Sequence, residues 1–302
     1  MTIPKHKLES VKKIITHANC PDGTVSAIVL RYQFPNVPVR FIQYGTEAHE
    51  KLPAEPGMLF CDFSPPRSRV QEFVDAGAIV LDHHVGAKDI VEAFGDSGVY
   101  SDEPGVSGAV LAYQEVTFPF FSSPISLHIS TTVKLAGIRD TWQKTHPLWK
   151  DACVQAYGLQ FFPERYYLET PVEVILEEWP LLERIGRIEL ENSKIKIDRL
   201  LEGAYRFTTK DGLRVVIFQG IHSTSDAAEV ATDCDLIVGF SYYVENVPIM
   251  VVSLRSRTNF DCANFAKRNG GGGHLKAAGF QVTPTLDPYT TIRNLIKIHE
   301  AS

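Results

Sequence analysis

The first third of the chain repeats one pattern: a short apolar run, a polar side chain after it, and then apolar residues at helical spacing. The apolar runs lie at 11–16, 39–44, 57–61 and 78–81. Helical spacing follows the first and third of them, at 22–32 and 67–76. Strands that alternate with helices form right-handed βαβ units around a mostly parallel sheet. We therefore predict an α/β fold, with a mostly parallel sheet and flanking helices.

The rest of the chain predicts a second, smaller domain. Helical spacing continues at 105–113, 125–138 and 151–201. Short apolar runs return at 213–218, 236–243 and 249–254, with predicted helices at 225–231 and 289–299. Because 302 residues fit two domains, we predict one domain at 1–190, a helical connector at 191–202 and a smaller α/β domain at 203–302.

Charge and cysteine usage exclude several classes of protein. The net charge of −6 leaves no overall basic footprint, so we expect no stable binding to long duplex DNA. The five cysteines form no C-x-x-C pair, which indicates a reducing compartment. No apolar stretch approaches the ~20 residues of a membrane span, and the start of the chain lacks the apolar core of a signal peptide. We therefore expect a cytoplasmic protein that does not enter a membrane.

Acids and histidines gather where the predicted strands end. They are His17 with Asp22, then Asp62, then Asp82 with His83 and His84, and Asp140 after a predicted helix. One such carboxylate is usually a cap of a loop or helix, but several at the carboxyl edge of a parallel sheet indicate a site. Oxygen and imidazole ligands without thiolate pairs suit Mn, Mg, Fe or Co ions, and they do not resemble the ligands of a structural zinc site. Two such ions can bind a phosphoryl group and convert water to hydroxide.

The consecutive histidines are the sharpest local signal. Neighbouring side chains on a turn are expected to diverge, so that one of His83 and His84 binds a metal while the other faces the substrate. Asp82 would then orient an imidazole. The alternative is a solvated turn that happens to hold two histidines.

A run of glycines marks the second domain. Gly270, Gly271, Gly272 and Gly273 precede His274. Such a run either forms a nest of backbone N–H groups for phosphate or acts as a flexible hinge. Because Arg255 and Arg257 follow an apolar run shortly before it, anion binding is favoured.

Taken together, these motifs resemble the DHH/DHHA1 family of phosphoesterases, which includes RecJ-like exonucleases, nanoRNases, pAp phosphatases and cyclic-dinucleotide phosphodiesterases. The likeness covers nearly the whole chain. It rests on THANCPDGTVSA at 16–27, CDFS around Asp62, LDHH at 81–84, GIRDTW around Asp140, SLRSR at 253–257 and GGGGHLKAAGF at 270–280. The resemblance implies a DHH domain followed by a DHHA1-like domain.

The resemblance also implies roles for the residues. The site would hold two divalent ions, most often Mn²⁺, with Mg²⁺, Co²⁺ or Zn²⁺ as alternatives. The implied metal ligands are His17, Asp22, Asp62 as the bridge, His83 and Asp140. His84 would contact phosphate, Asp82 would orient an imidazole, and Arg257 would face the phosphate oxygens. Arg255, Arg257, Gly271, Gly272, Gly273 and His274 would bind the nucleotide end of the substrate.

One position departs from the family pattern. Many relatives carry a further aspartate two positions before the equivalent of Asp22, where this chain has Cys20 next to Asn19. Asn19 is the better candidate for the polar group at this place; the alternatives are Cys20 itself, or a first metal that binds more weakly than the second. Ligation by a Cys20 thiolate would shift the preference toward softer ions such as zinc.

The expected activity is hydrolysis of phosphodiester or phosphomonoester bonds in nucleotides or short oligonucleotides. Oligoribonucleotides, cyclic or linear dinucleotides and pAp remain open as substrates. The rival predictions are a nucleotide-binding regulatory protein on an inactive DHH scaffold, and a pyrophosphatase or polyphosphatase. The sequence is compatible with a homodimer but does not fix the oligomeric state.

Overall fold

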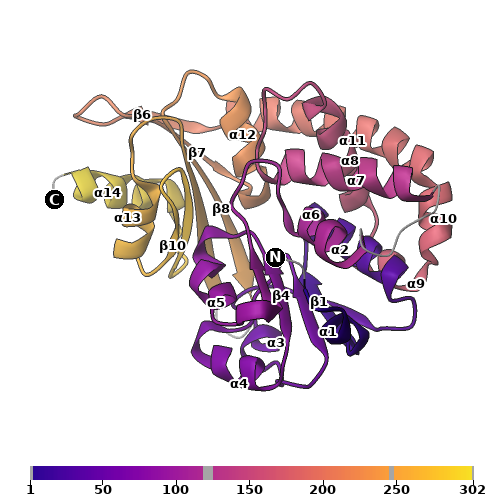
Figure 1. Ribbon diagram of the computed structural model, residues 1–302. Helices are drawn as coiled ribbons and strands as arrows, with labels where there is room; N and C mark the ends of the chain where they lie inside the picture. Colours follow the sequence, from indigo (N-terminus) through magenta and orange to yellow (C-terminus); the bar gives the residue numbers. More distant parts are fainter. Residues whose placement is uncertain (1–2, 118–124, 245–247, 301–302) are drawn as a thin grey trace. The chain divides into compact units, whose positions relative to one another are not determined.

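The computed structural model describes residues 3–117, 125–244 and 248–300. The chain forms two compact units, Met1–Leu190 and Glu191–Ser302. Helix α11 (Trp179–Glu202) runs across the boundary between them. Figure 1 shows the order of the elements along the chain.

The first unit holds a parallel sheet and most of the helices. Its strands are β1 (Lys13–His17), β2 (Val39–Ile42), β3 (Met58–Cys61), β4 (Ile79–Asp82) and β5 (Gly98–Tyr100). Its helices are α1 (Lys5–Glu9), α2 (Pro21–Gln33), α3 (Glu47–Glu50), α4 (Val70–Asp75), α5 (Lys88–Glu92), α6 (Gly108–Ala112), α7 (Ile125–Asp140), α8 (Trp149–Phe161), α9 (Glu164–Glu169) and α10 (Val172–Glu177), followed by α11.

The strand order of this sheet is β2-β1-β3-β4-β5, and every pairing in it is parallel. The chain therefore moves outward from β1 to β2 on one side and from β3 to β5 on the other. In sheets of this kind ligands bind at the carboxyl ends of the strands where the order reverses. That point lies between β1 and β3.

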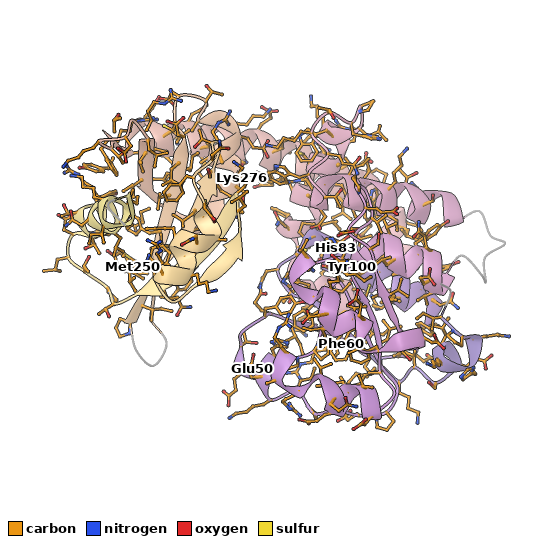
Figure 2. All side chains as sticks on the ribbon, turned by 60° about the vertical axis from the view of Figure 1, so that its left-hand side comes forward. Glu50, Phe60, His83, Tyr100, Met250 and Lys276 are labelled. Atoms are coloured by element: carbon orange, nitrogen blue, oxygen red, sulfur yellow. The ribbon has the colours of Figure 1, made fainter. Side chains whose placement is uncertain are left out.

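The parallel sheet is buried on both faces, because successive side chains of each strand point to opposite layers. On β1, Ile14 packs into a core with α2, α6 and α7, while Ile15 packs into a core with α4 and α5. Helix α2 lies deep in the first of these layers, since nine consecutive residues from Asp22 to Leu30 are buried. Figure 2 shows the buried Phe60 within this unit and His83 at one end of the sheet.

The second unit is built on a mixed sheet. Its strands are β6 (Tyr205–Thr208), β7 (Arg214–Gln219), β8 (Leu236–Val244), β9 (Pro248–Ser256), β10 (Gly272–His274) and β11 (Ala277–Val282). Its helices are α12 (Thr224–Val230), α13 (Cys262–Arg268) and α14 (Pro288–Glu300). The order is β10-β11-β9-β8-β7-β6, and only β7 and β8 pair in parallel.

Two cores cover the faces of this second sheet. One face, which includes Met250 (Figure 2), packs against α13 and α14. The other packs against α12 and the end of α11, through Ile197 and Leu201. The predicted fold class is confirmed: an α/β unit with a parallel sheet and flanking helices, and a smaller α/β unit after it.

The sequence missed the shortest or least apolar elements. Among them are β5, β6, β10 and β11, and the helices α1, α3, α5 and α13. Strand β5 has only three residues, and β10 consists of two glycines and a histidine, so neither carries a strand signal. Among residues 3–117, 125–244 and 248–300, no helix is long and apolar enough to cross a membrane.

Candidate metal centre

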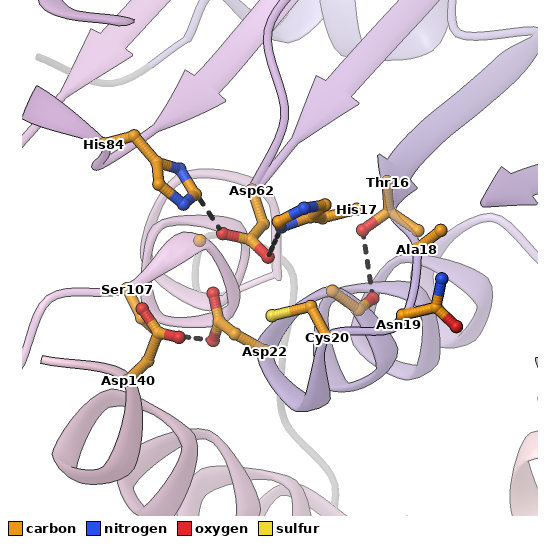
Figure 3. A network of polar contacts seen from close by, with 12 residues as sticks. Thr16, His17, Ala18, Asn19, Cys20, Asp22, Asp62, His84, Ser107 and Asp140 are labelled. Atoms are coloured by element: carbon orange, nitrogen blue, oxygen red, sulfur yellow. Dashed lines mark hydrogen bonds and ion pairs between the residues drawn. The ribbon is translucent and has the colours of Figure 1, made fainter. Parts of the chain in front are cut away.

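Three adjacent strands deliver polar side chains to the carboxyl edge of the parallel sheet. His17 is the last residue of β1, Asp62 directly follows β3, and Asp82 ends β4 just before His83 and His84. Because β1, β3 and β4 are neighbours in the sheet, these side chains lie side by side. Figure 3 shows His17 and His84 on either side of Asp62.

Two helices bring further carboxylates to the same place. Asp22 lies in the first turn of α2, and Asp140 is the last residue of α7. Asp140 Oδ2 is 3.1 Å from His83 Nε2, which is also 3.1 Å from Asp62 Oδ1. The five residues predicted as metal ligands therefore lie together in the first unit.

Three sets of side chains in this cluster have ligand atoms within 4.8 Å of one another. The sets are His17, Cys20 and Asp62; Asp62, His83 and His84; and Asp22, His83 and Asp140. Asp62 belongs to two of them, and so does His83. The chemistry of these donors, carboxylates and imidazoles with one thiol, is that of a site for divalent ions.

Asp22 is fixed by residues that the sequence did not single out. Ser107 Oγ donates to Asp22 Oδ1 at 2.5 Å, and the backbone N–H of Ala109 donates to the same carboxylate at 3.3 Å. This contact spans 85 residues of sequence, so no local pattern could have revealed it.

Gly108 allows α6 to approach the cluster. A Cβ atom at this position would lie 2.4 Å from Cβ of Asp62 and 2.6 Å from its Cα. Such distances exclude any side chain unless the backbone shifts. The first turn of α6 therefore packs directly against Asp62 because residue 108 is glycine.

The two histidines do not diverge, contrary to the sequence prediction. Their ring centroids lie 4.5 Å apart, and both rings face Asp62. The reason is Asp82, whose Oδ1 accepts hydrogen bonds from the backbone N–H groups of His83 and His84 at 2.8 and 3.1 Å. One carboxylate thus folds the turn so that both imidazoles lie on one side.

Asp82 also orients His84. His84 Nδ1 lies 2.7 Å from Asp82 Oδ1, which directs the Nε2 edge of the ring away from Asp82. The other carboxylate oxygen accepts hydrogen bonds from Ser64 Oγ at 2.5 Å and from the Tyr44 hydroxyl at 3.3 Å. Asp82 is completely buried and well partnered, as an orienting residue must be.

Gln43, another residue that the sequence did not single out, sets the direction of His17. Gln43 Oε1 lies 3.0 Å from His17 Nε2, while the amide nitrogen donates to Ala18 O and Tyr44 N–H donates to Oε1. These contacts make Oε1 the acceptor, so His17 donates from Nε2 and presents an unprotonated Nδ1. A signal was available, because Gln43 is a polar residue near the end of the predicted strand at 39–44.

Two buried atoms of the cluster have no hydrogen-bond partner in the part of the chain that the structure describes. They are His17 Nδ1 and Asp62 Oδ2, which lie 3.7 Å apart. Buried polar atoms are almost always partnered. A buried imidazole nitrogen and a buried carboxylate oxygen that face each other without a hydrogen bond fit a bound cation.

The pKa shifts of the cluster indicate that it favours bound positive charge. Burial, and then the charges of Asp62 and Asp140, raise the pKa of Asp22 well above its ordinary value. Burial lowers the pKa of His83, but its hydrogen bonds with Asp140 and Asp62 outweigh this and raise it to about 11. Burial also raises the pKa of Asp62, yet the imidazoles around it overcome this and lower it. The protons that neutralise this cluster occupy positions that a divalent cation would take.

The structure corrects the expectation for Asn19 and Cys20. Figure 3 shows the sulfur of Cys20 directed toward Asp22 and Asp62, while the side chain of Asn19 points away from the cluster. The ligand atoms of Cys20, His17 and Asp62 lie within 4.8 Å of one another. The thiol is neutral by itself, since burial and the carboxylates of Asp62, Asp140 and Asp22 raise its pKa well above its ordinary value.

The residues predicted to bind the nucleotide lie in the second unit. Arg255 donates to Ser225 Oγ at 2.9 and 3.1 Å, and the exposed Arg257 donates to the carbonyl oxygen of Ala228, so both contact α12. Arg255 lies opposite Ala277 on β11, which in turn lies opposite His274 on β10. The side chain of His274 lies outside the described residues.

The glycine run lies partly in a strand rather than in an open loop. Gly272 and Gly273 belong to β10 and pair with Gly279 and Ala278. A Cβ at Gly271 would lie 2.1 Å from the carbonyl oxygen of Gly279, so packing alone requires a glycine there. A Cβ at Gly272 would meet no atom within 4 Å.

Comparison with protein-family models and with the sequences of curated proteins gives no match. Solved structures do match. The pGpG-specific phosphodiesterase PggH from Vibrio cholerae aligns over 96% of this chain and 99% of its own, with 12% identity and a TM-score of 0.55. The DHH domain of a member of the s1p family of ribosomal proteins aligns over 97% and 87%, with 12% identity and a TM-score of 0.62.

A third structure is exonuclease RecJ bound to manganese. It aligns over 98% of this chain and 92% of its own, with 14% identity and a TM-score of 0.59. At such low identity the likeness concerns the fold, and it extends through both units of the chain. This protein therefore has the fold of the DHH-domain proteins, as its sequence motifs predicted.

Proposed function

We propose that this protein is a metal-dependent phosphoesterase that hydrolyses phosphodiester or phosphomonoester bonds of nucleotides or short oligonucleotides. The observation that carries the proposal is the convergence of His17, Asp22, Asp62, His83 and Asp140 on one buried cluster at the carboxyl edge of the sheet. Dispersed side chains would not support a hydrolase. Structural neighbours with this fold include a phosphodiesterase and an exonuclease.

The donor set fits two divalent ions. His17 and Asp62 would hold one, and Asp22, His83 and Asp140 would hold the other, with Asp62 shared between them. When bound, such ions polarise phosphoryl oxygens and lower the pKa of water so that hydroxide forms near neutral pH. RecJ is solved with Mn²⁺ and with Mg²⁺, so either is a reasonable choice for assays.

The remaining residues have roles that follow from their contacts. Asp82 fixes His84, and the Nε2 edge of this imidazole would donate a hydrogen bond to a phosphate oxygen. With about a third of its side chain exposed, His84 is accessible to a substrate. In the second unit, Arg255 and Arg257 would bind the anionic end of the nucleotide through charge-assisted hydrogen bonds.

Short substrates are favoured over long ones. The net charge of −6 gives no broad basic surface for a long strand, so the positive field comes from the metal site and from a few arginines. The substrate classes that fit are oligoribonucleotides of a few residues, linear or cyclic dinucleotides, and pAp.

The test is an assay of these substrates, together with pyrophosphate and polyphosphate, with Mn²⁺ and with Mg²⁺. We expect hydrolysis of at least one short nucleotide substrate, its loss in chelator, and its loss in Asp62→Ala, whose circular dichroism spectrum should match the wild type. The exposed Asp75→Ala is the matched control and should keep full activity.

Three results would contradict the proposal. Most activity retained by Asp62→Ala in added manganese would refute a site with two metals. Nucleotide binding without consumption would instead support the regulatory protein, whose only sequence sign is the departure at Cys20. Turnover confined to pyrophosphate or polyphosphate would exclude the nucleotide assignment.

A further inference from the structure

Cys20 lies at the start of α2. It is the N-cap residue, in an extended conformation, and its side chain makes no capping hydrogen bond. Ser, Thr, Asp and Asn stabilise a helix start at this position because their oxygens accept from the first turn, and a thiol does this poorly. The helix start therefore does not explain a cysteine here.

The local backbone turns the thiol toward the metal cluster. Asn19, just before it, adopts a left-handed conformation with φ of 56°, and its N–H donates to Glu164 Oε1 at 2.6 Å. This reversal carries the side chain of Asn19 away and leaves Cys20 directed inward, as Figure 3 shows.

An independent observation shows what the thiol faces. Among the described residues, His17 Nδ1 and Asp62 Oδ2 are two buried atoms of the cluster without a hydrogen-bond partner. Both belong to side chains that have a ligand atom close to the Cys20 thiol. The Asp62 side chain is completely buried, and the ligand atoms of the three residues lie within 4.8 Å of one another. An imidazole, a carboxylate and a thiolate make three protein ligands and leave a position open for water or substrate.

We propose that Cys20 is a ligand of the ion held by His17 and Asp62, and that this ion is a thiophilic one such as Zn²⁺ or Co²⁺ rather than Mn²⁺. Thiolates favour softer ions, whereas carboxylates and water favour Mg²⁺ and Mn²⁺. The set of Asp22, His83 and Asp140 contains no sulfur, so it keeps the preference for harder ions. The two sets of ligands then prefer different metal ions. This inference rests on the proposed function only in that the cluster binds metal.

The first test is optical. The metal-free full-length protein is titrated with Co²⁺ alone, and absorbance is followed in the near ultraviolet, where a thiolate bound to Co²⁺ gives a charge-transfer band. We expect the band in the wild type and its loss in Cys20→Ser. Cys61→Ala is the matched control, since Cys61 is a buried thiol beside the cluster but donates to Gly108 O instead. It should keep the band.

The second test measures affinity and also covers the case that Cys20→Ser does not fold. Cys20→Asp restores an oxygen ligand of similar reach. We expect the ratio of Zn²⁺ affinity to Mn²⁺ affinity at the tighter site to fall by about 10- to 100-fold. Loss of a residue that only orients a metal ligand already changes affinity on this scale. Circular dichroism establishes that each variant is folded.

The inference is overturned by a wild type without the band, by a band that persists in folded Cys20→Ser, or by an unchanged affinity ratio in Cys20→Asp. Its failure is distinguishable from that of the proposed function. A band without hydrolysis of any substrate would support Cys20 as a metal ligand and contradict the phosphoesterase activity. Hydrolysis without a band would support the phosphoesterase activity and contradict the role of Cys20 as a ligand.

Discussion

The two units of this protein use their sheets in different ways. In the first, every strand runs in the same direction, so β1, β3 and β4 all end at one edge, and Asp62 and Asp82 there are completely buried. In the second, neighbouring strands mostly run in opposite directions, and Arg255 on β9 is half-buried while Arg257, just after β9, is exposed. A parallel sheet gathers polar groups at one point, whereas an antiparallel sheet spreads them along a row.

This comparison predicts that changes in the first unit act on metal binding and on the chemical step, while changes in the second act on substrate affinity or stability. A substitution in the second unit that abolishes metal binding would contradict this prediction most clearly. The four substitutions below are ordered from the largest expected effect to the smallest.

Gly108→Ala should have the largest effect. Its Cβ would lie 2.4 Å from Cβ of Asp62, so α6 and the carboxylate must separate. We expect hydrolysis to fall by about 100-fold or more, because small displacements of catalytic groups cost on that scale. The free energy of unfolding should also fall, by about 1–3 kcal/mol. Urea unfolding and steady-state kinetics measure both. Gly86→Ala, where a Cβ meets no atom within 4 Å, is the control and should change neither.

Gln43→Leu should weaken metal binding by about 10- to 100-fold, as loss of a group that orients a metal ligand generally does. The reason is that Gln43 Oε1 accepts the Nε2–H of His17 and so presents Nδ1 to the cluster. Isothermal titration with Zn²⁺ and Mn²⁺ gives the affinities, and nitrogen chemical shifts of His17 give its tautomer. Gln43→Glu keeps an acceptor and should keep the wild-type tautomer. If Gln43→Leu binds metal as tightly as the wild type, Gln43 does not position His17.

Arg255→Gln should raise KM about tenfold and leave kcat and metal affinity nearly unchanged, since one charge-assisted hydrogen bond contributes roughly 1.5–3 kcal/mol. Arg255 lies on β9 and donates to Ser225 on α12. The control is Arg214→Gln in the same unit, because the Arg214 guanidinium pairs with Asp235 instead. A large fall in metal affinity in Arg255→Gln would contradict the prediction that the second unit acts on substrate affinity and not on metal binding.

Asp235→Asn should have the smallest effect. Hydrogen bonds from the Arg214 guanidinium lower the pKa of Asp235 to about 2, below the unfolded value of about 3.9. A lowered pKa adds stability above the unfolded value, and this is lost as pH falls through the folded value. The variant should therefore be less stable by about 1 kcal/mol at pH 7, the scale of a partly exposed ion pair, and the difference should vanish near pH 2. Urea unfolding at both pH values measures it; an equal difference at both would show that charge pairing is not the cause.

The sequence predicted β1, β2, β3 and β4 because each contains a mostly apolar run, as expected for strands buried on both faces, but it missed the short β5. It also predicted where His17, Asp62 and Asp82 gather, because strand direction decides which edge they reach. It did not find β10, since glycines carry no apolar period, nor the contact of Ser107 with Asp22 across 85 residues. Propensity and periodicity describe only residues close in sequence.

The amino-acid sequence by itself determined the α/β architecture, the order of the polar groups and their family resemblance, since these depend on local periodicity and motif spacing. Only the tertiary structure decided how the groups face one another. It brought His83 and His84 onto one side of Asp82, and it turned Cys20 inward and Asn19 outward. The physical reason is that side-chain direction depends on backbone dihedral angles and on long-range hydrogen bonds, which are fixed only when the whole unit packs.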